Sequence, residues 1–249
     1  MGALKRFITA FGQYLLLMKD ACKKPQNWKV FSRRIIFEMK ALGVDSIVIV
    51  LIISIFVGAA VVMQILLNLD NPMYPKWIYG FVSRKAMMLE FSPTIISLIL
   101  AGKCASRIAS ELGTQRITEQ IDALEIMGVN TASYLIMPKI LACVIFFPIL
   151  AVQSIFVALI GGALGGLLLG TLTMFDYVEG LRLEFEMGDL WYAMVKIIVN
   201  AVIISTVSCF RGYTIKGGSV EVGQQSTKAV VQSSIVIMIF NILITELFN

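Results

Sequence analysis

The chain has 249 residues, of which 58% are hydrophobic and 15% are charged, and its mean hydropathy is +0.84. Soluble domains are about half apolar and a quarter charged, so this composition excludes an ordinary soluble domain and indicates an integral membrane protein. The sequence contains no histidine, which removes the commonest general base and metal ligand and argues against a catalytic or metal site. The four cysteines form no CxxC pair, so neither a disulfide framework nor a zinc site is predicted.

The first 45 residues are basic and amphipathic. Apolar residues recur at helical spacing over 1–20 and again over about 28–42, and both stretches are expected to be helices lying in the membrane interface. A signal peptide fits 1–20 poorly, because Gln13 interrupts the apolar run and a basic segment follows it. A basic arm can bind nucleic acid, but beside membrane segments it indicates anionic headgroups and a cytoplasmic N-terminus, so no nucleic-acid partner is expected.

Five membrane spans are predicted from the long apolar runs that follow, at about 46–67, 86–105, 134–165, 190–210 and 229–247. The uncharged run from Ile140 to Phe175 is long for one span and short for two. One long span with a broken tail is favoured, and a helical hairpin, bent at Pro148 or at the following glycines, is the alternative. The chain is thus predicted to be an all-α membrane protein, with one domain over 1–249.

The connecting segments set the orientation. Five spans place the two ends of the chain on opposite sides, and the basic N-terminus is assigned to the cytoplasm. The segment at 171–189, expected to be a loop, is acidic and suits the outside. Residues 68–85, which include Asn71, Pro72, Pro75, Trp77 and Tyr79, are also expected to be a loop with interfacial aromatics. Lys76, Arg84 and Lys85 make this second loop the exception to the positive-inside rule.

The most informative segment is polar and lies between the second and third spans. Residues 103–130 read KCASRIASELGTQRITEQIDALEIMGVN. Over about 114–127 a single helix would have an apolar face and an acidic face, made of Ile117, Ile121 and Leu124 and of Glu119, Asp122 and Glu125. Gly128 follows where a left-handed C-terminal cap is needed. Such a helix can pack one face under the membrane and present carboxylates to a soluble partner, although the spacing alone favours a solvated linker.

Two runs in this segment, Glu111 to Thr114 and Thr118 to Gly128, closely resemble the signature of the MlaE/YrbE family, the permease subunits of ABC-type lipid transporters. The resemblance continues through Leu135, Pro138 and Lys139 and covers about 90–245. It implies that about 111–128 is a cytoplasmic coupling helix that inserts into a groove on an ATPase. The residues implied to make this coupling contact are Glu111, Thr118, Glu119, Gln120, Ile121, Asp122, Leu124 and Glu125.

The chain has no Walker motif of its own. Gly102-Lys103 is followed by Cys104, and Ser97 occupies the place of the first glycine. ATP and magnesium are therefore expected on a separate ATPase chain, and no cofactor is expected on this one.

Two ionisable residues are predicted inside spans. Glu90 precedes Lys103 by 13 residues, which at ~1.5 Å per residue is roughly 20 Å along a helix. Lys196 lies about six residues inside the fourth span, at a comparable depth. The two could pair or could line a polar pocket for a lipid headgroup. The alternatives are that Glu90 sits at the interface and that Lys196 snorkels to it.

Ser92-Pro93 follows Glu90, and the proline removes a backbone donor and can kink the helix. The family usually has glycine before this proline and arginine before the glutamate, where this chain has Ser92 and Leu89. The departures leave the carboxylate and the kink in place. The predicted lipid-cavity residues are Glu90, Ser92, Pro93 and Lys196.

Overlapping GxxxG steps lie in the third span, at Gly161, Gly162, Gly165, Gly166 and Gly170. In an apolar helix they allow a neighbouring backbone to approach closely, and the partner helix could belong to this chain or to a second copy. A phosphate-binding loop is excluded, because no lysine or hydroxyl follows.

The resemblance also implies partners and a location. These are a second copy of the permease, two ATPase subunits, a periplasmic MCE-domain protein and phospholipid, in the bacterial inner membrane, with a contribution to outer-membrane lipid asymmetry. Two other classes stay open, a membrane-embedded lipid-modifying enzyme and a scaffold that only tethers an ATPase. The lack of histidine argues against the enzyme, and a tether needs no ionisable pair such as Glu90 and Lys196 within the membrane.

Overall fold

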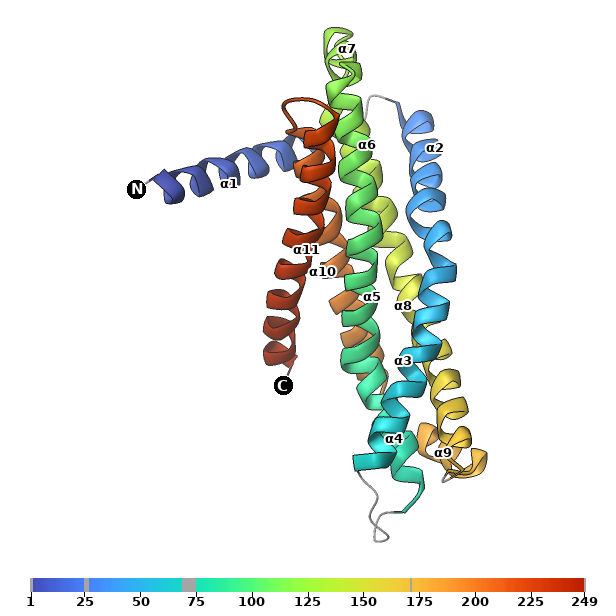
Figure 1. Cartoon of the computed structure of the whole chain (residues 1–249). Helices are drawn as coiled ribbons and strands as arrows, with labels where there is room; N and C mark the ends of the chain where they lie inside the picture. Colours follow the sequence, from blue (N-terminus) through green and yellow to red (C-terminus); the bar gives the residue numbers. More distant parts are fainter. Residues whose placement is uncertain (1, 25–26, 69–74, 171, 249) are drawn as a thin grey trace. The chain divides into compact units, whose positions relative to one another are not determined.

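The computed structural model describes residues 2–24, 27–68, 75–170 and 172–248, and these residues form helices, turns and short irregular segments without a β-strand (Figure 1). The predicted loop residues Asn71 and Pro72 lie outside the described residues. Five helical runs are long and apolar enough to cross a bilayer: Trp28–Asn68, Trp77–Ile117, Ala132–Leu168, Met187–Tyr213 and Ser219–Phe248. The prediction of an all-α membrane protein with about five spans is confirmed.

The N-terminal region contains one separate amphipathic helix rather than two. Helix α1 (Gly2–Ala21) exposes large apolar side chains at Ile8, Phe11, Leu15 and Leu16. Helix α2 (Trp28–Glu38) continues through a π turn (Met39–Gly43) and a 3₁₀ turn (Val44–Ser46) into α3 (Ile47–Asn68). The expectation that 28–42 is a helix separate from the first span is therefore wrong. No proline or left-handed cap separates this stretch from the first apolar run, so the helix does not stop.

The second run begins earlier than the sequence indicated. Helix α4 (Trp77–Ala86), a π turn (Met87–Phe91), α5 (Ser92–Leu100), a second π turn (Ala101–Ala105) and α6 (Ser106–Ile117) follow one another without a break. The predicted loop at 68–85 is thus helical from Trp77 onward.

The remaining helices are α7 (Gln120–Ile126), a π turn (Ala132–Ile136) leading into α8 (Met137–Leu168), α9 (Met174–Arg182), α10 (Met187–Tyr213) and α11 (Ser219–Phe248). The segment at 171–189, predicted to be a loop, instead contains α9 and the first residues of α10. Thr173 provides the start signal for α9, since its hydroxyl accepts from the Asp176 amide at 3.2 Å.

Helix α8 answers the question left open by the uncharged run at 140–175. It is unbroken across Pro148, so the hairpin alternative is wrong. Its glycines pack against α3 of the same chain: a side chain at Gly161 would overlap the Ile55 carbonyl, and one at Gly58 would overlap the Ala158 carbonyl. The partner of the GxxxG steps is therefore α3.

The chain divides into two compact units. Unit 1 comprises Met1–Asp45, Leu100–Phe146 and Asn200–Ile239, and unit 2 comprises Ser46–Ile99, Phe147–Val199 and Phe240–Asn249. In unit 1 a side chain at Gly212 would lie 2.8 Å from the Ala109 carbonyl oxygen, so α6 and α10 pack closely there. In unit 2, α4 and α9 lie side by side (Figure 1).

The packing of α4 against α9 explains why Arg84 is an exception to the positive-inside rule. Arg84 is buried and donates to the carbonyls of Leu181 and Glu184, both at 3.0 Å, at the end of α9. These are carbonyl groups that a helix end leaves without intrahelical partners. Tyr177 of α9 is buried beside Ser83, and burial raises the pKa of its phenol, so the hydroxyl stays neutral and donates to the Leu159 carbonyl at 3.1 Å. Arg84 is thus a structural cap and not part of an exposed loop.

Candidate functional sites

The two ionisable residues predicted inside spans form an ion pair in unit 2. Lys196 Nζ lies 2.8 Å from Glu90 Oε1. The lysine side chain has 0% exposure, so it does not snorkel, whereas the glutamate side chain is 48% exposed. The pair therefore neutralises a wholly buried ammonium group and leaves one side of the carboxylate open.

Two hydroxyl groups complete this ion cluster, which consists of Glu90, Tyr192, Lys196 and Thr245. Tyr192 and Thr245 donate to the same Glu90 oxygen at 3.2 Å and 3.1 Å. Lys196 Nζ also lies 3.1 Å from the Thr245 hydroxyl and 4.6 Å from the centre of the Tyr192 ring. Sequence reasoning missed Tyr192 and Thr245, although Tyr192 lies four residues before Lys196 and so shares its helical face.

Pro93 contributes to the cluster through the backbone. It has no N–H to donate to the Leu89 carbonyl four residues earlier, and Lys196 Nζ donates to that carbonyl at 3.2 Å. Glu90 itself lies in the π turn (Met87–Phe91) that directly precedes Ser92 and Pro93. Short π segments within α-helices occur often at functional sites. Pro93 thus leaves the Leu89 carbonyl without its usual amide donor, and Lys196 donates to that carbonyl.

Ser92 does not join the cluster. Its side chain is buried and lies 2.9 Å from the Ser154 hydroxyl of α8, which accepts from Ser54 of α3 at 3.0 Å. These three hydroxyl groups connect helices within unit 2. The prediction grouped Ser92 with Glu90 and Lys196, but the described contacts of Ser92 are with α8.

The signature segment forms a helical corner in unit 1 rather than one helix. Helix α6 ends at Ile117, Glu119 has a left-handed backbone (φ 59°), and α7 begins at Gln120. The expectation of one helix over about 114–127 is therefore wrong. Arg116 and Asp122, on the two sides of the break, are joined by a 2.7 Å ion pair that stabilises the bend.

The predicted left-handed cap at Gly128 is confirmed, with φ 76°. The Gly128 amide donates to the Glu125 carbonyl at 2.9 Å, and the Val129 amide donates to the Leu124 carbonyl at 3.1 Å. This is the Schellman pattern that ends a helix. Helix α7 is thus terminated by glycine at a fixed residue.

The corner residues divide into those that hold it together and those that face solvent. The Glu125 carboxylate accepts from Tyr213 at 2.9 Å and from Thr131 at 3.1 Å, which joins α7 to the end of α10. Ile121 has 0% exposure and belongs to the interior. Ile126 and Met127 are 88% and 68% exposed. The exposed corner surface includes Thr118, Glu119, Gln120, Ala123, Ile126, Met127 and Gly128, and Glu125 is exposed as well as bonded.

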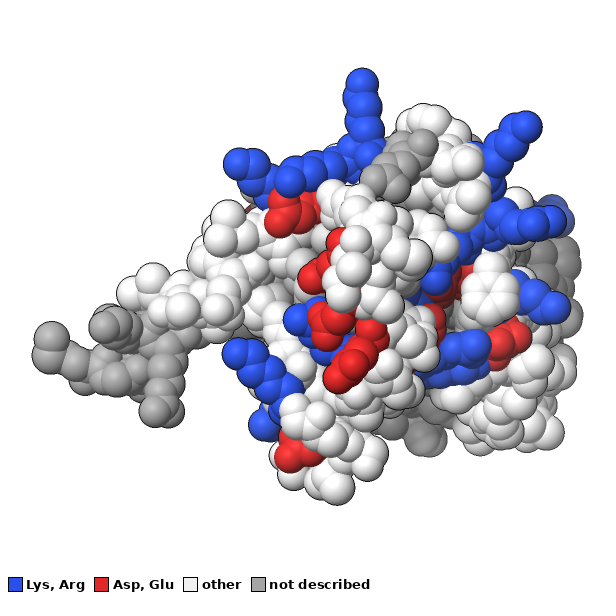
Figure 2. Space-filling view, turned by 90° about the horizontal axis from the view of Figure 1, so that it is seen from above, with Lys and Arg blue, Asp and Glu red and all other residues white. Residues whose placement is uncertain are grey.

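Glu111, predicted to contact a partner, forms an ion pair within unit 1, and its side chain is 34% exposed. Lys139 Nζ lies 2.8 Å from Glu111 and 2.6 Å from Glu38, and both Lys139 and Glu38 are buried. This buried ion triad, Glu38, Glu111 and Lys139, joins α2, α6 and α8. Figure 2 shows the end of the molecule that carries the corner, with basic side chains around its edge and acidic side chains among and inside them.

Apolar helices of membrane-spanning length, a buried ion pair among them and a polar corner define a multi-pass membrane protein. The sequence matches the family described as Permease MlaE over residues 35–247. The chain belongs to the MlaE family of ABC transporter permeases.

Relatives agree with this assignment along nearly the whole chain. A protein of Rickettsia bellii named "Probable ABC transporter permease protein" is 34% identical, over 98% of this chain and 93% of its own length. A protein of Synechocystis sp. named as another probable ABC transporter permease is 30% identical, over 88% of this chain and 83% of its own. The Arabidopsis thaliana protein TRIGALACTOSYLDIACYLGLYCEROL 1, chloroplastic, is 31% identical, over 88% of this chain and 63% of its own.

Proposed function

We propose that this permease moves phospholipid, driven by an ATPase on a separate chain, and that the ion cluster of Glu90, Tyr192, Lys196 and Thr245 binds the lipid headgroup. The observation that carries the proposal is the Glu90–Lys196 pair, in which the lysine is wholly buried and the carboxylate is half exposed. Ionisable residues within membrane helices are costly and mark substrate paths. A scaffold that only tethers an ATPase needs no such pair. The name of the Arabidopsis relative, which is that of a diacylglycerol lipid, also supports a lipid substrate.

The same proposal assigns the rest of the assembly. Two permease copies would form the lipid cavity, with their N-termini and corners in the cytoplasm, in a bacterial inner membrane. A periplasmic MCE-domain protein would exchange lipid with them. The basic N-terminal segment supports this orientation through the positive-inside rule.

The corner would be the ATPase contact. Its exposed Glu119, Ile126 and Met127 form an acidic and apolar surface that suits a groove of basic and apolar residues. Asp122 and Glu125 would act indirectly, since their carboxylates hold the bend through Arg116 and Tyr213. Ile121 is buried and would support the corner from inside.

The headgroup role is tested by reconstituting the permease with its ATPase and measuring lipid movement. We expect Glu90→Gln and Lys196→Met to lower the transport rate by about tenfold or more, because each removes a charged hydrogen-bonding partner. The matched control is Lys85→Met, which removes a lysine paired with Asp189 at 3.8 Å in the same unit. If Glu90→Gln and Lys196→Met transport lipid as well as Lys85→Met does, the headgroup role is wrong. If the unsubstituted permease retains the ATPase but moves no lipid, the scaffold function is favoured.

The ATPase contact is tested separately by co-purification. We expect Glu119→Lys combined with Met127→Asp to release the ATPase. The first change reverses a charge and the second replaces an apolar side chain by a charged one, while the hydrogen bonds and ion pairs within the corner are unchanged. Glu179→Lys, an exposed charge reversal on α9, serves as the control and should leave the ATPase bound. Retention of the ATPase by the corner variant would exclude this surface as the contact.

A further inference from the structure

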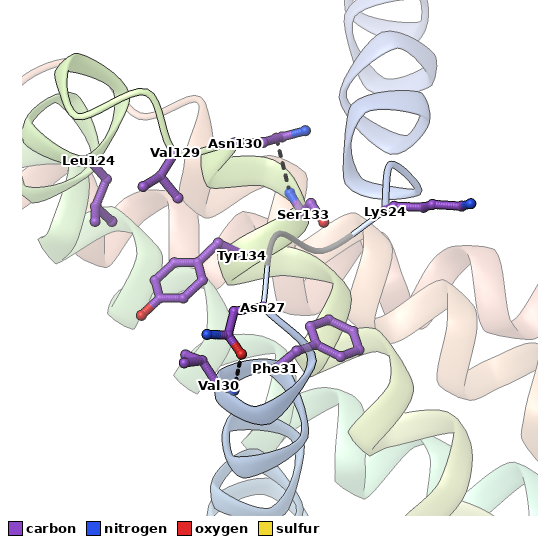
Figure 3. Close-up of a pocket in the computed structure, with 9 residues that line it drawn as sticks. All are labelled: Lys24, Asn27, Val30, Phe31, Leu124, Val129, Asn130, Ser133 and Tyr134. Atoms are coloured by element: carbon purple, nitrogen blue, oxygen red, sulfur yellow. Dashed lines mark hydrogen bonds between the residues drawn. The ribbon is translucent and has the colours of Figure 1, made fainter.

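A pocket of about 200 Å³ lies in unit 1 where the end of α1, the start of α2 and the segment after α7 meet (Figure 3). Its walls are largely apolar. Val30 and Phe31 come from α2, Leu124 and Val129 from α7 and its cap, and Tyr134 from the π turn before α8. No residue of either candidate ion site, the ion cluster or the buried ion triad, lines this pocket.

The pocket walls are fixed by specific contacts. The guanidinium group of Arg34 lies 4.0 Å from the centre of the Tyr134 ring and donates to the Tyr134 carbonyl at 3.2 Å. Asn130 donates to the Asp20 carbonyl at 3.2 Å and Ser133 donates to the Lys23 carbonyl at 2.8 Å, which fastens the end of α1 to the segment after the corner. The pocket is therefore a built feature with ordered walls.

Basic residues lie around the pocket. Lys24 lines it, although Figure 3 shows the end of this side chain directed away from the other lining residues, and Lys29 and Arg33, which do not line it, are exposed on the first turns of α2. Asn27 caps α2 by accepting from the Lys29 amide at 3.0 Å, and Figure 3 shows its amide nitrogen on the opposite side, toward Tyr134. The nearby acid Asp20 is paired with Lys23 at 2.7 Å. An amide donor thus faces the pocket and basic side chains lie around it, with apolar walls behind them.

The two helices beside the pocket, α1 and α2, both expose large apolar side chains. Helix α1 exposes Phe11, Leu15 and Leu16, and α2 exposes Trp28, Ile36 and Phe37. Amphipathic helices with such faces lie in the headgroup region, where lysine and arginine attract anionic lipids. A soluble partner would have to displace lipid from these faces, so the observations favour a lipid occupant.

We propose that this pocket binds an anionic phospholipid of the surrounding bilayer, with the phosphate at Lys24 and Asn27 and an acyl chain along Phe31 and Tyr134. The site is separate from the transported lipid at Glu90 and Lys196. Because Leu124 and Val129 belong to the corner, a bound lipid would brace the surface proposed to contact the ATPase. This last step rests on the proposed function, whereas binding itself requires only that the chain lie in a membrane.

The test is native mass spectrometry of the full-length permease released from nanodiscs, with counting of retained lipids. Phosphatidylglycerol in phosphatidylcholine is the probe, and phosphatidylcholine alone is the comparison. We expect Lys24→Gln to weaken phosphatidylglycerol retention about fivefold, in line with one lysine near an anionic surface. Lys19→Gln removes the same charge from an exposed position on α1 outside the pocket and should leave retention unchanged.

A second variant pair tests the pocket itself. Val30→Trp fills the wall and should abolish the retained lipid, whereas Ile36→Trp adds the same bulk to an exposed position of the same helix and should not.

Equal losses in Lys24→Gln and Lys19→Gln would mean diffuse attraction and would overturn the site. Full retention in Val30→Trp, or equal retention of phosphatidylcholine, would do the same. Displacement by inorganic phosphate would show that the headgroup alone binds and would overturn the acyl-chain assignment. The headgroup role of Glu90 and Lys196 is unaffected by any of these outcomes.

Discussion

Lys139 holds three helices of unit 1 together through two carboxylates. Its side chain and that of Glu38 are almost fully buried, and the second oxygen of Glu38, Oε2, has no hydrogen-bond partner among the described residues. Two carboxylates share the one ammonium group of Lys139, so loss of this charge would leave both carboxylates without a cationic partner in the triad. Helices α6 and α8 flank the corner in sequence, and the triad therefore fixes the base from which the corner projects.

We expect Lys139→Met to destabilise the permease by roughly 3 kcal/mol or more, because breaking a buried ion pair leaves an uncompensated charge. Lys40→Met, at an exposed position next to α2, should change stability little. Denaturant titration of the purified protein in detergent measures both. Equal stability of the two variants would mean that the triad contributes nothing to the fold.

At the scale of helices, two local features position the elements. One is the close contact of the α8 glycines with α3, and the other is the corner between α6 and α7 with its glycine cap. The sequence predicts the first as a close approach and the second as a helix end, because glycine spacing and a terminal glycine are local signals. It does not predict the break at Glu119, since a glutamate carries no local preference for a left-handed backbone. Nor does it predict α4 and α9, short helices held by the contacts of Arg84 with α9.

The α3–α8 contact is tested by Gly161→Ala. The added methyl group would overlap the Ile55 carbonyl, and overpacking of this kind costs about 1–3 kcal/mol. Gly102→Ala is the matched control, because its new methyl group meets no atom within 4 Å. Thermal unfolding midpoints should fall for the first variant only. A similar midpoint for both would place the close approach elsewhere.

The cap of α7 is tested by Gly128→Ala, which forces a side chain into a left-handed conformation at a cost of about 1–2 kcal/mol. The methyl group itself has open space, so the effect should be conformational and local. The backbone amides of residues 128 and 129 donate to carbonyls of α7. Their hydrogen-exchange rates should therefore be higher in the variant than in the unsubstituted protein. Gly223→Ala, which also has open space but an ordinary backbone, should show no such change.

At the scale of the whole molecule, the apolar runs predict the number of long helices well because hydrophobicity over about 20 residues is a strong signal. The ion cluster was only partly predictable. Glu90 and Lys196 stand out as charges in apolar runs, but Thr245 does not, and its place is set by packing in unit 2. The contact of Glu111 with Lys139 was also not predictable, because Lys139 comes from another helix.

The orientation of the chain is tested by single cysteines on a cysteine-free background. Five membrane crossings place position 120 in the cytoplasm and positions 186 and 248 outside, so a membrane-impermeant maleimide should label the last two from outside and the first only after permeabilisation. Labelling of position 248 from the same side as position 120 would require an even number of crossings.

The pairing of Lys196 with Glu90 also bears on how the protein is made. The two residues are 106 positions apart, so the ribosome delivers the carboxyl group to the membrane long before the lysine exists. During that interval Glu90 lies in an apolar segment without its cationic partner, which is costly. When α10 follows, Lys196 meets a carboxyl group that the earlier helix has already supplied, so the later helix has an ion partner that the earlier one lacked.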